Sequence, residues 1–173
     1  SEDERVEEVV KRIEDKLRRL LEESKRVVDD SKRRLDEWRK EVEKVVKKST
    51  DDLEKLRRDK VLEEVKKISK ETLDEARKLI DDARKRSDET LKRDERVIRE
   101  ADKKVKEITK RARDGDNREE VIKELEELIE RLARISKKTI EEDRRVNKEL
   151  AERIKEIIER NRRVIEEARE RLR

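Results

Sequence analysis

The sequence lacks most of the residue types from which catalytic and metal sites are built. Its 173 residues include no cysteine, histidine, proline, methionine, phenylalanine or tyrosine, and only one tryptophan and one glycine. Without cysteine there is no disulfide, thiolate nucleophile or cysteine-ligated zinc. Without histidine, no side chain of ordinary pKa titrates between about pH 5 and 8. We therefore expect no catalytic residue, no bound metal and no cofactor.

Charged residues are the majority of the amino acids in the sequence. They make up 61% of the chain, and its 55 basic and 51 acidic residues are mixed at the scale of one helical turn. A nucleic-acid-binding protein would gather lysine and arginine on one face, so we expect no nucleic-acid partner. No run approaches the roughly 18 apolar residues of a membrane span, and no targeting signal is found. The sequence predicts a soluble protein without a membrane partner, consistent with cytoplasmic recombinant expression, and assigns no compartment.

The apolar residues, 29% of the chain, recur at a helical spacing. Between Val6 and Leu56 the pattern repeats every 18 residues, so that Val9, Val27 and Val45 occupy equivalent positions. Eighteen residues make about five turns of an α-helix, which brings each position back to the same face. A heptad repeat would impose a left-handed supercoil, whereas this repeat matches a straight helix. The charged majority is therefore the solvated surface of long helices and not a sign of disorder.

Two breaks divide the pattern into three helices. A second stripe, which begins at Val61, would lie about 160° around from the first if the helix ran on through Arg57 to Lys60. We therefore predict a turn there, with Asp59 as the next N-cap. The second break contains Gly115, suited to a left-handed C-terminal cap, followed by Asp116 or Asn117 as the next N-cap.

The fold class predicted is all-α: a single-chain antiparallel up-down-up three-helix bundle of long, nearly straight helices, coiled-coil-like. The helices are expected at about 2–57, 60–113 and 117–172, and together they form one domain over 1–173. Short connections between the helices favour antiparallel neighbours.

Polar residues inside the stripes are expected to meet across the helices. A buried polar group without a partner costs about 1–3 kcal/mol, so isolated placement would be destabilising. With the turns as placed, three levels result: Ser24 with Thr90, Asp94, Thr139 and Asp143; Ser31 with Ser87 and Asn147; Ser49 with Ser69, Thr72 and Asn161. We predict that these residues form a structural polar core of hydrogen-bonded layers. For a single serine or threonine, the alternative is a hydrogen bond to its own helix.

Asp94 and Asp143 invite a metal-site interpretation, because inward carboxylates on facing helices begin the metal sites of bundles. Such sites add glutamate and histidine ligands, and these stripes offer only serine, threonine and asparagine. We expect instead that hydroxyl groups, or an arginine or lysine from the flank, satisfy the carboxylates. A filled core also leaves no pocket for a small-molecule substrate.

The 18-residue repeat, the charged surface, the helix caps and the polar layers resemble de novo designed, parametrically generated helical bundles with buried hydrogen-bond networks. The resemblance covers the whole chain. It implies a hyperstable structural scaffold with no natural activity. We expect the chain to be a monomer. The alternative is a helical binding module that completes a four-helix or larger bundle with a partner helix or a second copy, as a homo- or hetero-oligomer.

Overall fold

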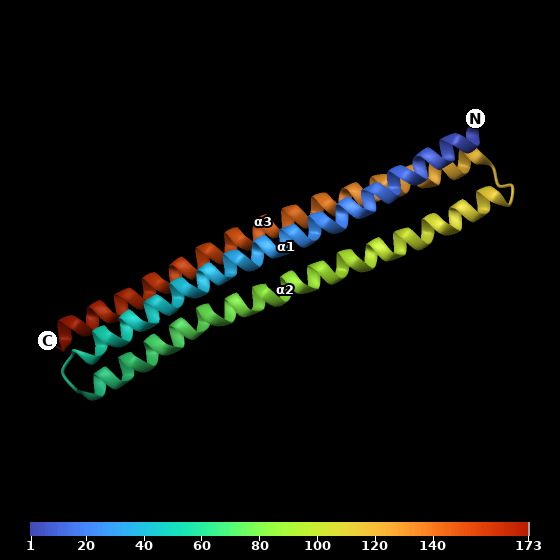
Figure 1. Ribbon diagram of the computed structural model, residues 1–173. Coiled ribbons are helices and arrows are strands. Elements are labelled where there is room, and N and C mark those ends of the chain that lie inside the picture. The colour runs from blue at the N-terminus through green and yellow to red at the C-terminus, as the bar shows by residue number, and fades with distance from the viewer. Residues whose placement is uncertain (173) are drawn as a thin grey trace. The chain divides into compact units, whose positions relative to one another are not determined.

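The computed structural model describes residues 1–172 and contains three long helices, α1 (Glu2–Glu54), α2 (Lys60–Arg113) and α3 (Arg118–Arg171). The helices pack against one another as a three-helix bundle, and residues 1–172 contain no strand (Figure 1). The predicted fold class is thereby confirmed. The chain forms two compact units: unit 1 comprises Ser1–Asp30 and Ser87–Asp143, and unit 2 comprises Ser31–Arg86 and Arg144–Arg173. The expectation of one domain over 1–173 stays a prediction.

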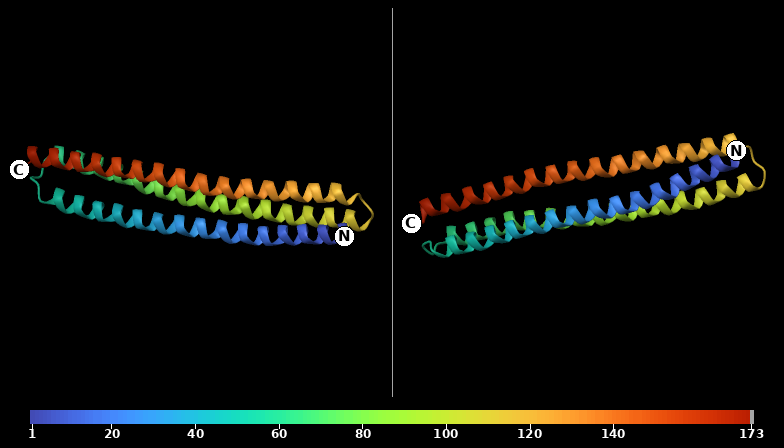
Figure 2. Two further views of the ribbon diagram at one scale, coloured as in Figure 1. Left: turned by 90° about the horizontal axis from the view of Figure 1, so that it is seen from above. Right: turned by 45° about the horizontal axis from the view of Figure 1, so that its top comes forward.

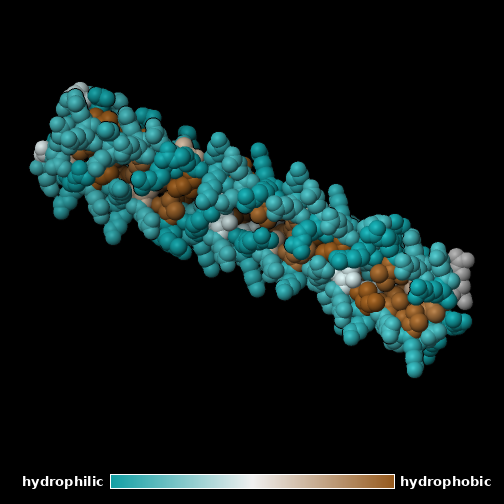
Figure 3. Space-filling model, turned by 180° about the vertical axis from the view of Figure 1, so that it is seen from behind, coloured by the Kyte–Doolittle hydropathy of each residue, from teal (hydrophilic) through white to brown (hydrophobic). Residues whose placement is uncertain are grey.

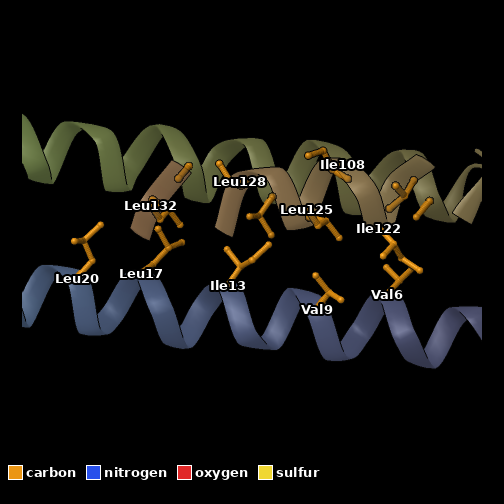
Figure 4. Packing of buried hydrophobic residues seen from close by; sticks show 14 residues of the cluster. Val6, Val9, Ile13, Leu17, Leu20, Ile108, Ile122, Leu125, Leu128 and Leu132 are labelled. Atoms are coloured by element: carbon orange, nitrogen blue, oxygen red, sulfur yellow. The ribbon is translucent and has the colours of Figure 1, made fainter. Parts of the chain in front are cut away.

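The core of unit 1 consists of aliphatic side chains from all three helices (Figure 4). On α1, the side chains of Val9, Ile13 and Leu17 recur at intervals of four residues and are buried. In the close view, Val9 and Ile13 point toward Leu125 and Leu128 of α3, and Leu17 points toward Leu132. This spacing keeps successive side chains on one face of the helix, which is the face that loses contact with water.

Unit 2 contains two separate apolar clusters. The first includes Leu35, Val42, Ile80 and Ile154, and the second lies toward the end of α3 with Leu53, Leu62, Ile165, Ala168 and Leu172. Charged side chains cover most of the face seen in Figure 3, and apolar side chains are visible between them. The aliphatic residues are thus concentrated where helices meet.

Ion pairs between α1 and α2 in unit 2 define their direction and register. Asp36 accepts a hydrogen bond from Arg84 at 2.9 Å, and Glu43 accepts one from Arg77 at 2.7 Å; Arg39 and Asp81 pair between them. Residue numbers rise along α1 as they fall along α2, so the two helices are antiparallel. The pairs follow the register predicted from the sequence to within one helical turn.

In unit 1, the contacts between α1 and α3 run in the same direction along both helices. Arg118 donates to Asp3 at 2.8 Å, and Ser136 donates to Glu23 at 2.9 Å. These two helices are therefore parallel, as the up-down-up topology requires, and all three helices of unit 1 can be followed in the views of Figure 2.

The first connection begins earlier than the sequence predicts. α1 ends at Glu54, and not near residue 57. The Arg57 amide donates to the Leu172 carbonyl at 3.2 Å instead of continuing the helix, which ties the connection to the end of α3. Asp59 is the N-cap of α2, as expected, because its Oδ1 accepts from the Val61 amide at 3.2 Å.

The second connection contains a Schellman motif. The Asp116 amide donates to the Arg111 carbonyl at 3.1 Å, and the Gly115 amide donates to the Ala112 carbonyl at 3.4 Å. Gly115 has φ +101°, in the left-handed region that this motif requires. The sequence-based role of Gly115 is therefore confirmed.

Asn117, and not Asp116, is the N-cap of α3. Its Oδ1 accepts from the amides of Glu119 at 2.9 Å and Glu120 at 3.3 Å, two groups that lack a partner within the helix. At the start of α1, Ser1 and Glu4 form a capping box: the Glu4 amide donates to Ser1 Oγ at 3.3 Å.

Replacing Gly115 with alanine is expected to lower the free energy of unfolding by about 1–2 kcal/mol. A Cβ at this position meets no atom within 4 Å, so the cost comes from the backbone conformation alone. Urea unfolding followed by circular dichroism measures the change. The Gly115→Asn variant is the control and should lose less, because asparagine tolerates positive φ better. Equal stability of Gly115→Ala and the unaltered chain would contradict the assignment.

Candidate functional site

A buried carboxylate joins the three helices of unit 1. Asp94, on α2, is 0% exposed. Its Oδ2 accepts a hydrogen bond from Ser24 Oγ of α1 at 2.7 Å and another from Thr139 Oγ1 of α3 at 2.9 Å. We call these three residues, with Arg93, the Asp94 cluster. Each helix contributes one side chain to the carboxylate, so the bonds link all three.

Arg93 supplies the charge that faces this carboxylate. Its Nε donates to Asp94 Oδ1 at 3.4 Å, its Nη1 to Glu142 at 3.1 Å and its Nη2 to Thr139 Oγ1 at 3.3 Å. A buried carboxylate is costly unless it is paired and hydrogen bonded, and both of its oxygens have partners here. Hydroxyl groups and a flanking arginine satisfy Asp94, in agreement with the expectation from sequence.

A neutral cluster joins the three helices of unit 2. Ser69 Oγ of α2 donates to Asn161 Oδ1 of α3 at 2.6 Å, and Asn161 Nδ2 donates to Ser49 Oγ of α1 at 2.9 Å. Ser49 Oγ in turn donates to the Val45 carbonyl at 2.6 Å. Ser49, Ser69 and Asn161 are buried, and we call them the Asn161 cluster. The chain of bonds uses both the carbonyl oxygen and the amide nitrogen of Asn161.

The Asn161 cluster lies between the two apolar clusters of unit 2, and the Asp94 cluster lies at the end of the apolar core of unit 1. On α1 of unit 2, Ser49 follows Val42 of the first apolar cluster and precedes Leu53 of the second. On α1 of unit 1, Ser24 follows Leu20 at the end of the apolar core. Sliding one helix by a turn, about 5.4 Å, would pull the hydrogen-bonding groups apart and leave them buried without partners. The arrangement therefore favours one register within each unit.

Two predicted members stand outside these clusters. Thr72 is half-buried, and its hydroxyl donates to the Ile68 carbonyl of its own helix at 2.7 Å. Thr90 is also half-buried, and Ser24 bonds to Asp94 instead. A half-buried threonine can bond to its own backbone more readily than to a facing helix, as Thr72 does. For Thr72 the structure shows the alternative interaction, a hydrogen bond to its own helix, and its membership of the polar core at the Ser49 level stays a prediction.

The remaining predicted residues are divided between the units. Ser31 is buried and Asn147 is half-buried in unit 2, whereas Ser87 and Asp143 are half-buried in unit 1. The predicted level of Ser31, Ser87 and Asn147 has members in both units, and it stays a prediction.

Sequence reasoning did not single out Arg93 of the Asp94 cluster, or Glu142, which accepts a hydrogen bond from Arg93. Both look like ordinary surface residues in a chain that is 61% charged. A usable signal existed in the position of Arg93 directly beside the inward Asp94, since a long side chain can curl from the flank toward a buried carboxylate.

A surface ion pair in unit 2 provides the clearest pH-dependent contact. Arg77 donates to Glu43 through Nε at 2.7 Å and through Nη2 at 2.8 Å, and its Nη1 donates to Asp74 at 2.9 Å. The bidentate hydrogen bond from Arg77 lowers the pKa of Glu43 below its ordinary 4.5. The same contact raises the pKa of Arg77.

A Glu43→Gln substitution is expected to lower the free energy of unfolding at pH 7 by less than about 1 kcal/mol. The Glu43 side chain is 49% exposed, so solvent screens the pair. A carboxylate with a lowered pKa stabilises the fold above its ordinary pKa and loses this contribution as pH falls through the folded-state value. Urea unfolding from pH 7 to about pH 3 should therefore show a difference that shrinks toward zero below about pH 4.5. A difference that grows with acidity would contradict the pairing.

The geometry defines the chain as a three-helix bundle whose buried polar groups bond across the helices. Among residues 1–172, no group of three or more histidine, cysteine, aspartate or glutamate side chains is arranged to hold a metal ion. Within the same residues, no helix combines the length and apolar character needed to cross a membrane. No protein-family model, curated protein or solved structure matches the chain.

Proposed function

We propose that the protein is a structural scaffold, of the de novo designed kind that the sequence resembles, with no catalytic activity, natural substrate or cofactor. The observation that supports this most strongly is the pairing of buried polar side chains with partners on the other helices. Ser24, Asp94 and Thr139 meet in one unit, and Ser69 and Asn161 meet in the other. Such bonds specify how helices pair, which is the task of a scaffold.

The absence of any matching natural family supports the same proposal. In an enzyme, a buried carboxylate is useful when it faces a substrate. Asp94 faces two hydroxyl groups and a guanidinium, which occupy both of its oxygens. It therefore acts as an acceptor within the fold, and no general base role is proposed for it.

Light scattering coupled to size exclusion, with thermal unfolding of the same sample, tests the proposal. We expect a single species of 21.1 kDa and an unfolding midpoint above about 90 °C. A stable dimer, or a midpoint in the ordinary range of about 45–65 °C, would argue against a hyperstable monomeric scaffold. The dimer result would favour the alternative, a module that completes a larger bundle.

Replacing Asn161 with leucine is expected to change the free energy of unfolding by less than about 1 kcal/mol, or to raise it. Ser49 keeps its bond to the Val45 carbonyl, and Ser69 can turn to its own helix, so little is left without a partner. The variant should instead lose specificity, seen as doubled amide signals in a ¹⁵N–¹H spectrum or as added oligomers in light scattering. A large loss of helicity, or an unchanged single set of signals, would contradict a role in helix register.

A further inference from the structure

A cavity between α1 and α2 of unit 2 is not used by the scaffold role. Its volume is about 330 Å³, at the lower end of the roughly 300–1,000 Å³ of small-molecule sites. Ser49 and Ser69 of the Asn161 cluster line its inner side. The cavity therefore lies where the apolar core of unit 2 is interrupted, and its wall is not uniformly apolar.

The inner surface of the cavity carries aliphatic side chains. Leu53 and Leu73 are buried, and Val46 is half-buried. The hydroxyl groups beside them are already committed as donors: Ser49 to the Val45 carbonyl and Ser69 to Asn161. The inner surface can therefore take an apolar group and offers no spare hydroxyl proton to a ligand.

The rim of the cavity has an excess of positive charge. Lys66, Lys70 and Arg77 line it from α2, and Glu54 is the acidic residue among its lining side chains. Arg77 is compensated by Glu43 and Asp74.

The two lysines are the groups that can meet a ligand. Lys66 has a loose contact to Glu63 at 3.7 Å between partly exposed side chains, a kind of pair that contributes little. Lys66 and Lys70 lie one turn apart on α2, so both ammonium groups can turn toward one anion.

We propose that this cavity binds small amphipathic anions, in which a sulfonate, sulfate or carboxylate is attached to a ring system or a short alkyl chain. The apolar part would lie against Val46, Leu53 and Leu73, and the anionic group would meet Lys66 and Lys70.

The probe is 8-anilinonaphthalene-1-sulfonate, titrated into the full chain and followed by its fluorescence. We expect saturable binding of one probe per chain. The double variant Lys66→Gln with Lys70→Gln should raise the Kd by about fivefold or more, the loss expected from two partly exposed charge contacts. The control is Lys67→Gln with Lys78→Gln, which removes the same net charge from exposed positions of the same helix, away from the cavity, and should leave the Kd unchanged.

A competition experiment separates the two halves of the proposed ligand. Naphthalene-1-sulfonate should displace the probe, whereas inorganic sulfate at the same concentration should not, because it lacks the apolar part. Circular dichroism of each variant verifies that the helices are intact. The proposal is overturned if the probe does not saturate, if both double variants weaken it equally, if neither does, or if sulfate alone displaces it.

Discussion

Replacing Ile154 with alanine is expected to lower the free energy of unfolding by about 2–5 kcal/mol, the largest loss that we predict for a single substitution. Ile154 is 0% exposed and belongs to the apolar cluster of unit 2 that includes Leu35, Val42 and Ile80. Its truncation removes apolar contacts and leaves a cavity that rigid helices close only in part. Urea unfolding monitored by circular dichroism measures the loss.

The chain offers a matched control in Ile68, which carries the same side chain on α2 of the same unit but is 47% exposed. Ile68→Ala should change stability by less than about 1 kcal/mol, because little area is lost and alanine is the better helix former. Similar losses for the two alanine variants would mean that the apolar cluster around Ile154 is not packed as described.

Replacing Asp94 with alanine is expected to lower the free energy of unfolding by about 2–4 kcal/mol. The substitution removes the acceptor of the Ser24 and Thr139 hydroxyl groups, and hydrogen bonds to charged groups contribute about 1.5–3 kcal/mol each. Relief of the carboxylate's own desolvation offsets part of this loss. Alanine also leaves a cavity where the carboxylate stood.

Two further substitutions distinguish the causes of that loss. Asp94→Leu fills the volume with apolar atoms and should cost less than Asp94→Ala, because the two hydroxyl groups can turn to their own helices. Glu89→Ala removes an exposed carboxylate from the same helix and should change stability by less than about 0.5 kcal/mol. Equal effects of Asp94→Ala and Glu89→Ala would show that the buried hydrogen bonds contribute nothing measurable.

Much of the fold follows from the spacing of the apolar residues. The 18-residue repeat predicts long helices, and the change of phase near residue 57 predicts the first connection although neither glycine nor proline marks it. Asp59 and Gly115 were identified from the chemistry of helix caps, which depends on neighbouring residues only. The end of α1 at Glu54 lies earlier than predicted, and the Arg57–Leu172 bond in the connection that follows joins residues far apart in the sequence, which helical spacing does not reveal.

The candidate site was predictable in outline and less so in detail. Helical geometry places Ser24 level with Asp94 and Thr139, and Ser49 level with Ser69 and Asn161, and these residues do bond. The level of a residue along the helix axis does not say in which direction its side chain points around that axis. Thr72 is predicted at the level of Ser49, and its hydroxyl bonds to its own helix. The hydrogen bond from Arg93 to Asp94 depends on the conformation of a long side chain at the edge of the stripe. The spacing of residues in the sequence does not predict that conformation.

The central claim is that buried polar side chains bond across the helices within each unit. Nuclear magnetic resonance of the Asn161 side-chain amide tests it most directly. We predict nuclear Overhauser contacts from these two amide protons to the β-protons of Ser49 and Ser69, and slow exchange with solvent. An amide that exchanges as fast as an exposed asparagine, with no contact to either serine, would contradict the account.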